Sequence, residues 1–180
     1  LDLADDVLFA QLLQKVRDGH YDLLLASPPC STFSKVRGRP EGPPLLRGVG
    51  VPDIYGLRHL RPKDAEAVRL GTLLALRTLE LARAFKALGR PWVVENPVED
   101  VCAPSLWGLP EWAEFATEHG CCSTDIVQCA FGVDYEKRTT FKGSFVLDGG
   151  SRECQHPYRQ MKIRPYGKVF RVRHPPLVGK

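Results

Sequence analysis

Several things that this sequence lacks narrow what the chain can be. It has no run of about eighteen apolar residues, so no segment is expected to cross a membrane as a helix. Its first residues are acidic and apolar rather than basic, which argues against a secretory signal peptide. It has no initiator Met, which indicates a fragment of a longer chain. We expect an intracellular protein with no membrane partner, nuclear if the source is eukaryotic and cytoplasmic if it is bacterial or phage.

The six cysteines include no paired C-x-x-C motif. An even number is compatible with disulfides, but 180 residues with 43% hydrophobic content can bury a full core, so reduced thiols are favoured. An alternative is a zinc site made from Cys121, Cys122, Cys129, Cys154 and His156. Because the paired spacing is lacking, the favoured interpretation is small buried side chains, and we expect no metal site.

Positive charge is unevenly distributed along a chain of net charge +4. Residues 35–63 hold seven Lys and Arg and residues 152–180 hold eight, whereas residues 93–136 hold none against nine acids. If both basic segments face one way, they form a surface that follows a phosphate backbone. Solvated loops would give the same pattern, so charge alone leaves both interpretations open.

The spacing of apolar residues predicts alternating helices and strands. Helices are expected at residues 5–18, 63–88 and 110–118, and strands at residues 21–26, 92–94, 125–129 and 139–146. Helix, strand, loop, helix and strand in this order imply a crossover between parallel strands. We therefore predict one α/β domain over residues 1–180, with three layers and a mainly parallel sheet.

Residues 31–60 are expected to form a mobile loop beside a site. They hold nine Gly and Pro, and loops this long inside a compact domain are usually functional or mobile. Cys30 and Glu95 each follow a predicted strand. Ligands bind beyond the carboxyl ends of parallel strands, so we expect these two residues on one rim of the sheet.

Two short motifs carry a family resemblance. Residues 27–34 read S-P-P-C-S-T-F-S and residues 92–97 read W-V-V-E-N-P. The first resembles the P-P-C-x-x-F-S signature of cytosine-C5 DNA methyltransferases, and the second resembles the E-N-V signature of that family. A looser match starts at F-G-V of residues 131–133 and continues through Lys137, Arg138 and Phe141, similar to a region that contacts DNA backbone. The resemblance covers residues 22–141 and implies a partial Rossmann-like methyltransferase fold.

The resemblance implies a monomer that transfers a methyl group from S-adenosylmethionine to carbon 5 of cytosine in DNA. Cys30 would attack carbon 6, because a thiolate is both a strong nucleophile and a good leaving group. Glu95 would grip and protonate nitrogen 3 of a base flipped out of the duplex. Asn96 would orient Glu95 or hold the loop near Cys30.

Further residues follow from the same resemblance. Asp2 and Pro28 are expected to contact the cofactor. The loop after Cys30 would close over DNA, and Arg47 within it could contact phosphate. The residues expected to bind nucleic acid are Ser34, Lys35, Arg37, Arg39, Lys137 and Arg138.

The sequence also departs from the family. The glycine-rich F-x-G-x-G turn and the closing G-N-x-V-x-P segment are absent, and Pro97 replaces the usual Val. One alternative is therefore a degenerate domain that binds nucleic acid without catalysis, in which Cys30 is an inert cysteine. A second alternative is an amino methyltransferase, which needs an aromatic residue after Pro-Pro and Asp or Asn before it. Ser27 and Cys30 occupy those places and argue against it.

Overall fold

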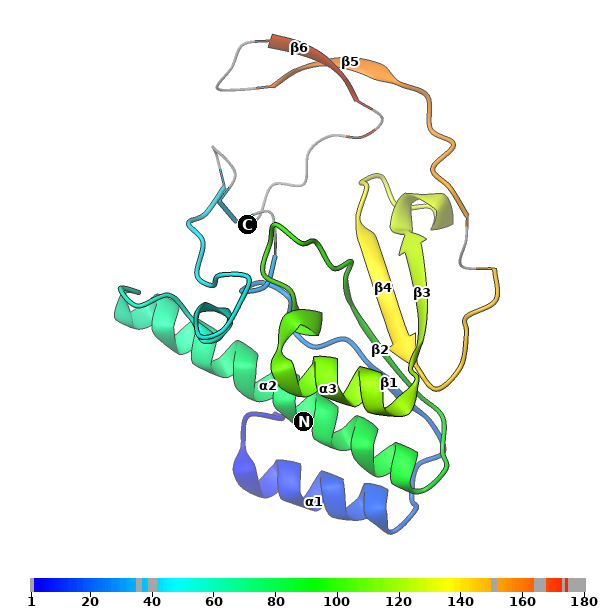
Figure 1. The fold of residues 1–180 in the computed structure, drawn as a ribbon. Helices are drawn as coiled ribbons and strands as arrows, with labels where there is room; N and C mark the ends of the chain where they lie inside the picture. Colours follow the sequence, from blue (N-terminus) through cyan, green and yellow to red (C-terminus); the bar gives the residue numbers. More distant parts are fainter. Residues whose placement is uncertain are drawn as a thin grey trace.

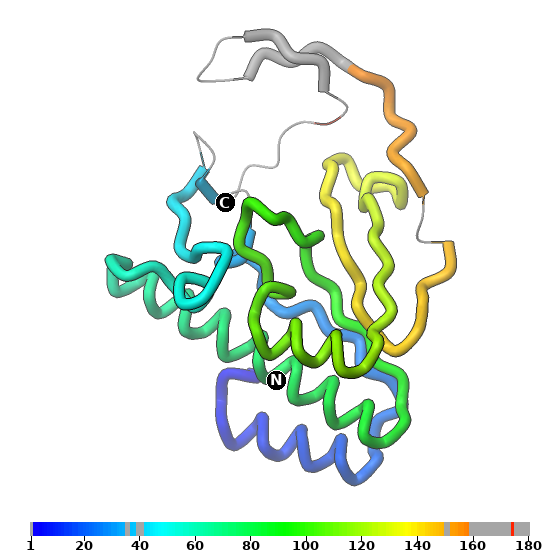
Figure 2. Tube along the Cα trace, in the orientation of Figure 1, coloured from blue at the N-terminus to red at the C-terminus, as the bar shows by residue number. Residues whose placement is uncertain are grey.

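The computed structural model describes residues 2–34, 37–38, 42–149, 152–163, 168–172 and 174, with the backbone alone for 159–163 and 168–172. Figure 1 shows helices on one side of a short sheet and a separate hairpin near the carboxyl end, and Figure 2 follows the chain through the helices and the sheet as a tube. The helices are α1 (Asp6–Arg17), α2 (Pro62–Ala87) and α3 (Pro110–His119), with short 3-10 turns η1 (Asp53–Tyr55), η2 (Leu106–Gly108) and η3 (Gln128–Phe131). The strands are β1 (Leu24–Ala26), β2 (Trp92–Pro97), β3 (Cys122–Val127), β4 (Arg138–Gly143), β5 (Arg159–Ile163) and β6 (Lys168–Val172).

The three predicted helices are confirmed, and local signals set their ends. Asp5 caps α1, because its carboxylate accepts a hydrogen bond of 2.9 Å from the Leu8 amide. Pro62 occupies the first turn of α2. Backbone N–H groups in that turn have no partner within the helix, so a residue without an N–H is tolerated there. Gly89, with φ of +65°, follows the end of α2, and Gly120, with φ of +57°, follows α3. Both adopt the left-handed conformation that ends helices.

The sheet is mixed, which corrects the prediction of a mainly parallel one. Its strand order is β1-β2-β4-β3; β1 and β2 are parallel, whereas β2 with β4 and β3 with β4 are antiparallel. A short connection through η3 joins β3 to β4, and so short a connection returns the chain antiparallel. A long crossover that contains α2 joins β1 to β2, and a second one that contains η2 and α3 joins β2 to β3, which lies parallel to β2 on the far side of β4.

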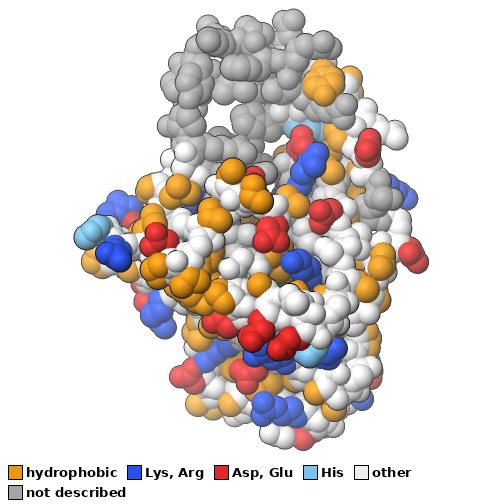
Figure 3. All heavy atoms as spheres, viewed as in Figure 1, with side chains coloured by type: hydrophobic (Ala, Val, Ile, Leu, Met, Phe, Trp, Pro, Cys, Tyr) orange, Lys and Arg blue, Asp and Glu red, His pale blue; other side chains and the backbone are white. Residues whose placement is uncertain are grey.

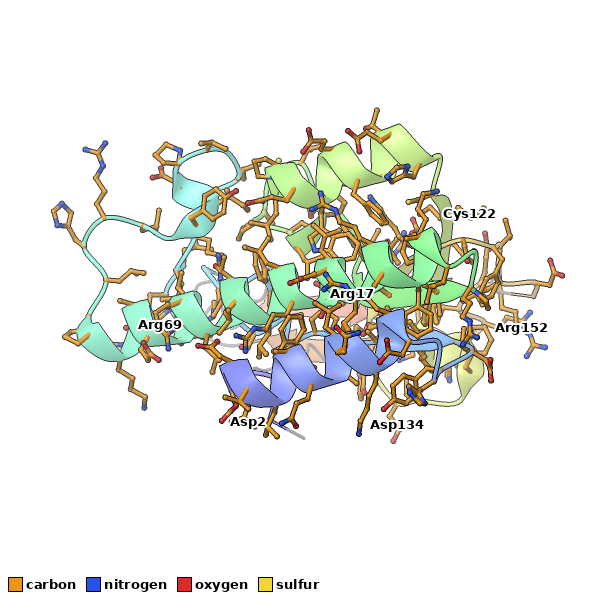
Figure 4. The ribbon with its side chains drawn as sticks, turned by 90° about the horizontal axis from the view of Figure 1, so that it is seen from below. Asp2, Arg17, Arg69, Cys122, Asp134 and Arg152 are labelled. Atoms are coloured by element: carbon orange, nitrogen blue, oxygen red, sulfur yellow. The ribbon has the colours of Figure 1, made fainter. Side chains whose placement is uncertain are left out.

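One hydrophobic core joins the helices to one face of the sheet. Phe9 of α1, Leu79 of α2 and Phe115 of α3 belong to the same buried cluster as Trp92 and Val94 of β2. Figure 4 shows α1 and α3 on either side of α2. On the opposite face of β1, Leu25 is 69% exposed. The structure is thus an α/β fold with a four-stranded mixed sheet, and the three-layer, Rossmann-like arrangement is not confirmed.

The second half of residues 31–60 is packed against α2. Ile54 and Arg47 are fully buried, and the Arg47 guanidinium donates to the carbonyl of Ile54 at 2.7 Å and to that of Val68 at 2.8 Å. Burial lowers the pKa of Arg47 to about 10, which leaves it charged at neutral pH. The prediction that Arg47 contacts phosphate is therefore wrong, because a guanidinium enclosed by protein cannot reach DNA. The mobility predicted for this stretch stays a prediction.

Sequence reasoning missed β5 and β6. They form an antiparallel pair with Met161 opposite Phe170. Figure 1 shows this hairpin beyond the ends of β3 and β4, at the opposite end of the molecule from α1. Among the described residues, no helix is both long enough and apolar enough to span a membrane.

Candidate active site

The segments that carry Cys30 and Glu95 lie side by side. In the parallel pairing, Ala26 at the end of β1 is opposite Val94 of β2, so the chain leaving β1 passes beside the end of β2. The Ser27 hydroxyl donates a hydrogen bond to Oε2 of Glu95. One residue further on, Nδ2 of Asn96 donates to the carbonyl of Pro28 at 3.0 Å. The two motifs, far apart in the sequence, therefore form one structural unit at the rim of the sheet.

Glu95 is held by contacts to both of its carboxylate oxygens. In addition to the Ser27 hydroxyl at Oε2, the Lys137 ammonium lies 3.1 Å from Oε1. The Glu95 side chain is 13% exposed, so this ion pair is screened less than a surface pair. A carboxylate can accept about four hydrogen bonds, so these two contacts leave acceptor sites for a further donor. Glu95 is therefore positioned, and it retains capacity to bind a ligand.

The turn that presents Cys30 is anchored on both sides. Before it, Asn96 is 1% exposed and binds Pro28, which matches the expected role of holding the loop near Cys30. After it, Phe33 is buried, and its amide donates to the Cys30 carbonyl at 2.9 Å. The Arg47 guanidinium lies 3.8 Å from the centre of the Phe33 ring. Cys30 itself is half-buried and forms no disulfide. This arrangement places a partly accessible thiol on a turn that packing makes rigid.

A glycine in α2 allows this turn to approach the helix closely. A Cβ on Gly71 would lie 2.7 Å from Oγ1 of Thr32 and 3.2 Å from Nη2 of Arg47. Thr32 is itself buried, and its hydroxyl accepts a hydrogen bond of 3.1 Å from Nε of Arg47. The position of Cys30 therefore depends on contacts with α2 that any side chain at residue 71 would disturb.

The predicted nucleic-acid contacts divide into three groups. Lys35 and Arg39 lie outside the described residues. Arg37 donates to the carbonyls of Ser31 at 2.7 Å and Pro44 at 3.1 Å, so its guanidinium braces the loop. Ser34 is half-buried in the same loop.

Lys137, directly before β4, and Arg138, its first residue, make different contacts. Lys137 is turned to Glu95 and forms an ion pair with it, a contact that the sequence did not predict. Arg138 has a 64% exposed side chain, with Nε 3.6 Å from Oε1 of Glu136. Arg138 is therefore the better placed of the two for a phosphate contact. Ser27 was also missed, although its position directly before Pro-Pro was a signal that could have identified it.

The two expected cofactor contacts do not form a cofactor pocket. Asp2 is exposed, and its carboxylate accepts a local hydrogen bond of 2.9 Å from the Ala4 amide. Figure 4 shows Asp2 beside the start of α1. Pro28 is buried, and its carbonyl is engaged by Asn96. The residues present therefore do not fit S-adenosylmethionine as they stand.

A groove of about 620 Å³ lies elsewhere, and its lining includes Leu46, Leu57 and Asp64 but neither Cys30 nor Glu95. Figure 3 shows apolar side chains gathered over this part of the chain, where Leu45, Val49 and Val51 are exposed. Its lining is mainly apolar and contains no thiol like that of Cys30.

A second group of reactive side chains surrounds Cys154. Its Sγ lies 3.1 Å from Nε2 of His174 and 3.6 Å from Nδ1 of His156. The hydrogen bond from His174 lowers the pKa of the Cys154 thiol to about 6. Cys129 lies in the same group. The set of possible zinc ligands considered from the sequence therefore needs correction. The cluster in the structure includes His174 and does not include Cys121 or Cys122.

No family model, curated protein or solved structure matches this chain. The family resemblance therefore rests on the motifs at residues 27–34 and 92–97 and on their juxtaposition.

Proposed function

We propose that this chain carries the base-activating half of a cytosine-C5 DNA methyltransferase. The observation that carries the proposal is the contact between its two motifs. The Ser27 hydroxyl, in the turn that leads to Cys30, hydrogen bonds Glu95, which lies within the neighbouring parallel strand β2 rather than after it as the sequence predicted. A nucleophilic thiol and a carboxylate at one rim are the pair that addition to carbon 6 of cytosine requires.

The chemistry of this pair can be followed bond by bond. The Cys30 sulfur forms a bond to carbon 6, and the electron pair of the carbon 5–carbon 6 double bond moves toward carbon 5. Glu95 stabilises this charge by hydrogen bonding and protonating nitrogen 3. Carbon 5 then accepts an electrophile and loses its original proton to a base. The thiolate is expelled as the double bond re-forms, and the proton on nitrogen 3 returns to Glu95.

Lys137 and Ser27 support this role of Glu95 by fixing both carboxylate oxygens. Their contacts hold the side chain in one orientation before the base arrives, so less ordering remains to be done on binding. Asn96 does the same for the Cys30 turn through Pro28. These are positioning residues, because they act through Glu95 and Cys30.

S-adenosylmethionine would supply the methyl group, and we propose that a further segment or partner completes its pocket. In support, β1 is an edge strand of the described sheet, and the residues Leu23 and Leu25 are 51% and 69% exposed. An apolar edge of this kind can accept another strand. A layer over the Leu25 face would also complete the three-layer, Rossmann-like fold. DNA as substrate, an intracellular location and a monomeric state are parts of the same proposal.

The alternative function is a nucleic-acid-binding domain without catalysis. One observation favours it: Lys137 already occupies one oxygen of Glu95, so the carboxylate has a structural partner. In that case Cys30 would never form a bond to DNA, and its removal would leave binding unchanged.

Exchange of the carbon 5 hydrogen of cytosine separates these two functions without needing a cofactor. In D₂O, addition of Cys30 lets carbon 5 take up a deuteron, and elimination after loss of the original proton leaves a deuterated cytosine. We expect mass spectrometry of DNA incubated with the chain to show deuterium at carbon 5. Exchange should vanish for Cys30→Ser and persist for Cys102→Ser, which changes an exposed cysteine in another turn. Binding of DNA with no exchange above the Cys30→Ser background would establish the alternative.

A further inference from the structure

We propose that Cys129, Cys154, His156 and His174 bind one Zn²⁺ in a structural site. One potential ligand atom from each of the four residues lies within 4.8 Å of all the others. They come from three segments: η3, the chain before β5, and His174, which lies two positions after the end of β6. This proposal is independent of the proposed function.

The distances are close to those of a tetrahedral zinc centre. Zn–S bonds of about 2.3 Å and Zn–N bonds of about 2.0–2.1 Å, at tetrahedral angles, place ligand atoms roughly 3.3–3.8 Å apart. The sulfur of Cys154 is 3.1 Å from Nε2 of His174 and 3.6 Å from Nδ1 of His156. The two imidazole rings meet at 74° with centroids 4.7 Å apart, so they approach from different directions rather than stacking. A small adjustment of side chains would complete the coordination.

The surroundings of His174 also suit a metal ligand. Its Nδ1 lies 3.0 Å from the carbonyl oxygen of Asp134. A carbonyl can only accept, so Nδ1 donates its hydrogen to it, and Nε2, which faces the sulfur of Cys154, is the nitrogen that would bind the metal after giving up the hydrogen it shares with that sulfur. A backbone carbonyl on the second ring nitrogen is the usual way in which a metal-binding histidine is oriented. Asp134 thus fixes the tautomer that metal binding needs.

The ligand types select the metal and its role. Two thiols and two imidazoles favour zinc over magnesium or calcium, which prefer oxygen ligands. Four protein ligands leave no open position for a reacting water, which is typical of structural zinc. Cys129 is 2% exposed and His174 is 7% exposed, so the metal would be largely enclosed on that side.

The location indicates what such a metal would stabilise. Cys154 and His156 precede β5 and His174 follows β6, so the ligands bracket both ends of the hairpin. Cys129 lies in η3, directly after β3. Near this point, the Arg152 guanidinium lies 5.4 Å from the centre of the Phe131 ring, a weak contact between the same two regions. A bound zinc would therefore fasten the hairpin in Figure 1 to the four-stranded sheet.

The test measures metal in the full chain, purified under reducing conditions without chelators. We expect about one zinc per chain by elemental analysis. Cys154→Ser and His174→Ala should each lower it at least tenfold, whereas Cys102→Ser should retain it. The chain refolded with Co²⁺ should show the visible absorption of a tetrahedral, thiolate-bound cobalt.

X-ray absorption of the wild-type zinc protein keeps the proposal testable even if the variants fail to fold. It should report two sulfur ligands at about 2.3 Å and two nitrogen ligands at about 2.0–2.1 Å. The proposal is overturned if the folded wild-type chain holds no zinc after incubation with a stoichiometric amount. It is also overturned by zinc retained in both variants, or by a Cys129–Cys154 disulfide in the reduced preparation.

Discussion

At the residue scale, the proposed chemistry depends on how the Glu95 carboxylate is held. Glu95 has Ser27 at one oxygen and Lys137 at the other, and its side chain is largely shielded from solvent. A glutamate with only a structural role would need nothing more than the ion pair. The proposed chemistry instead requires Glu95 to donate a proton to the base or share one with it. A substitution that keeps the shape of the side chain separates this role from packing.

Glu95→Gln should slow carbon 5 exchange by about two to four orders of magnitude, the usual loss when a general acid is removed. Glutamine has nearly the same shape as glutamate, and its carbonyl oxygen can accept the hydrogen bond from the Ser27 hydroxyl, so the fold should be retained. Glu99→Gln is the matched control, because Glu99 is a nearby exposed carboxylate 3.8 Å from Lys142. Equal exchange rates for the Glu95 and Glu99 variants would show that Glu95 has no chemical role.

Lys137 and Arg138 are neighbours in sequence with different expected effects. Lys137→Met should reduce exchange by roughly tenfold at saturating DNA, because Glu95 loses an orienting contact. Arg138→Ala should instead weaken DNA binding and make the dependence of log Kd on log salt shallower by about one. Binding titrations at several salt concentrations, with exchange rates, distinguish the two. The assignment fails if Lys137→Met alters only the salt dependence.

At the element scale, α2 is the support for the Cys30 turn. Gly71 allows Thr32 and Arg47 to sit against the helix, and this contact is the reason for a glycine in the middle of a long helix. A glycine there costs about 1 kcal/mol of helix stability relative to alanine. On propensity alone, Gly71→Ala would therefore stabilise the protein.

We expect the opposite, since the new Cβ would lie 2.7 Å from Oγ1 of Thr32. The net loss should be about 1–2 kcal/mol, or a fall in Tm of about 2–8 °C by thermal unfolding. Carbon 5 exchange should fall as well, because Thr32 is two residues from Cys30. Gly50→Ala is the control, as nothing lies within 4 Å of a Cβ at Gly50. An increase in Tm for Gly71→Ala would refute the close-packing argument.

The same elements show how far the sequence could be interpreted. Apolar periodicity and end signals such as Pro62 and Gly89 are local, so they located α1, α2 and α3 closely. Strand pairing is not local: nothing within residues 122–143 shows that β4 lies between β2 and β3. Parallel pairing was therefore assumed for strands that are antiparallel.

The site was likewise predicted only in part. Pro-Pro-Cys and Glu-Asn are contiguous motifs, and each identified a residue at the rim. Arg47 was misjudged because arginines are seldom fully buried, and only the tertiary structure reveals the carbonyls that surround it. His174 was missed because its partners Cys129 and Cys154 lie far away in the sequence.

At the scale of the whole molecule, the described chain brings the Cys30 turn and Glu95 to one edge, and the residues expected to contact S-adenosylmethionine do not form a pocket. Asp2 and Pro28 make local or backbone contacts, and the glycine-rich turn is absent from the sequence. We therefore expect S-adenosylmethionine to bind this chain with a Kd no tighter than about 1 mM in calorimetric titrations. A saturable Kd in the micromolar range would show that these residues form a pocket of a different kind.

The central claim is that Cys30 forms a covalent bond to carbon 6 of a pyrimidine gripped by Glu95. Its most direct test is mass spectrometry of the chain incubated with DNA that carries pyrimidin-2-one in place of cytosine. That base lacks the electron-donating amino group at carbon 4, so its carbon 6 accepts a thiolate more readily. We predict a one-to-one covalent complex that peptide mapping places on Cys30, lost in Cys30→Ser and kept in Cys102→Ser. A chain that binds this DNA without any adduct, or an adduct mapped to a cysteine other than Cys30, would contradict the account.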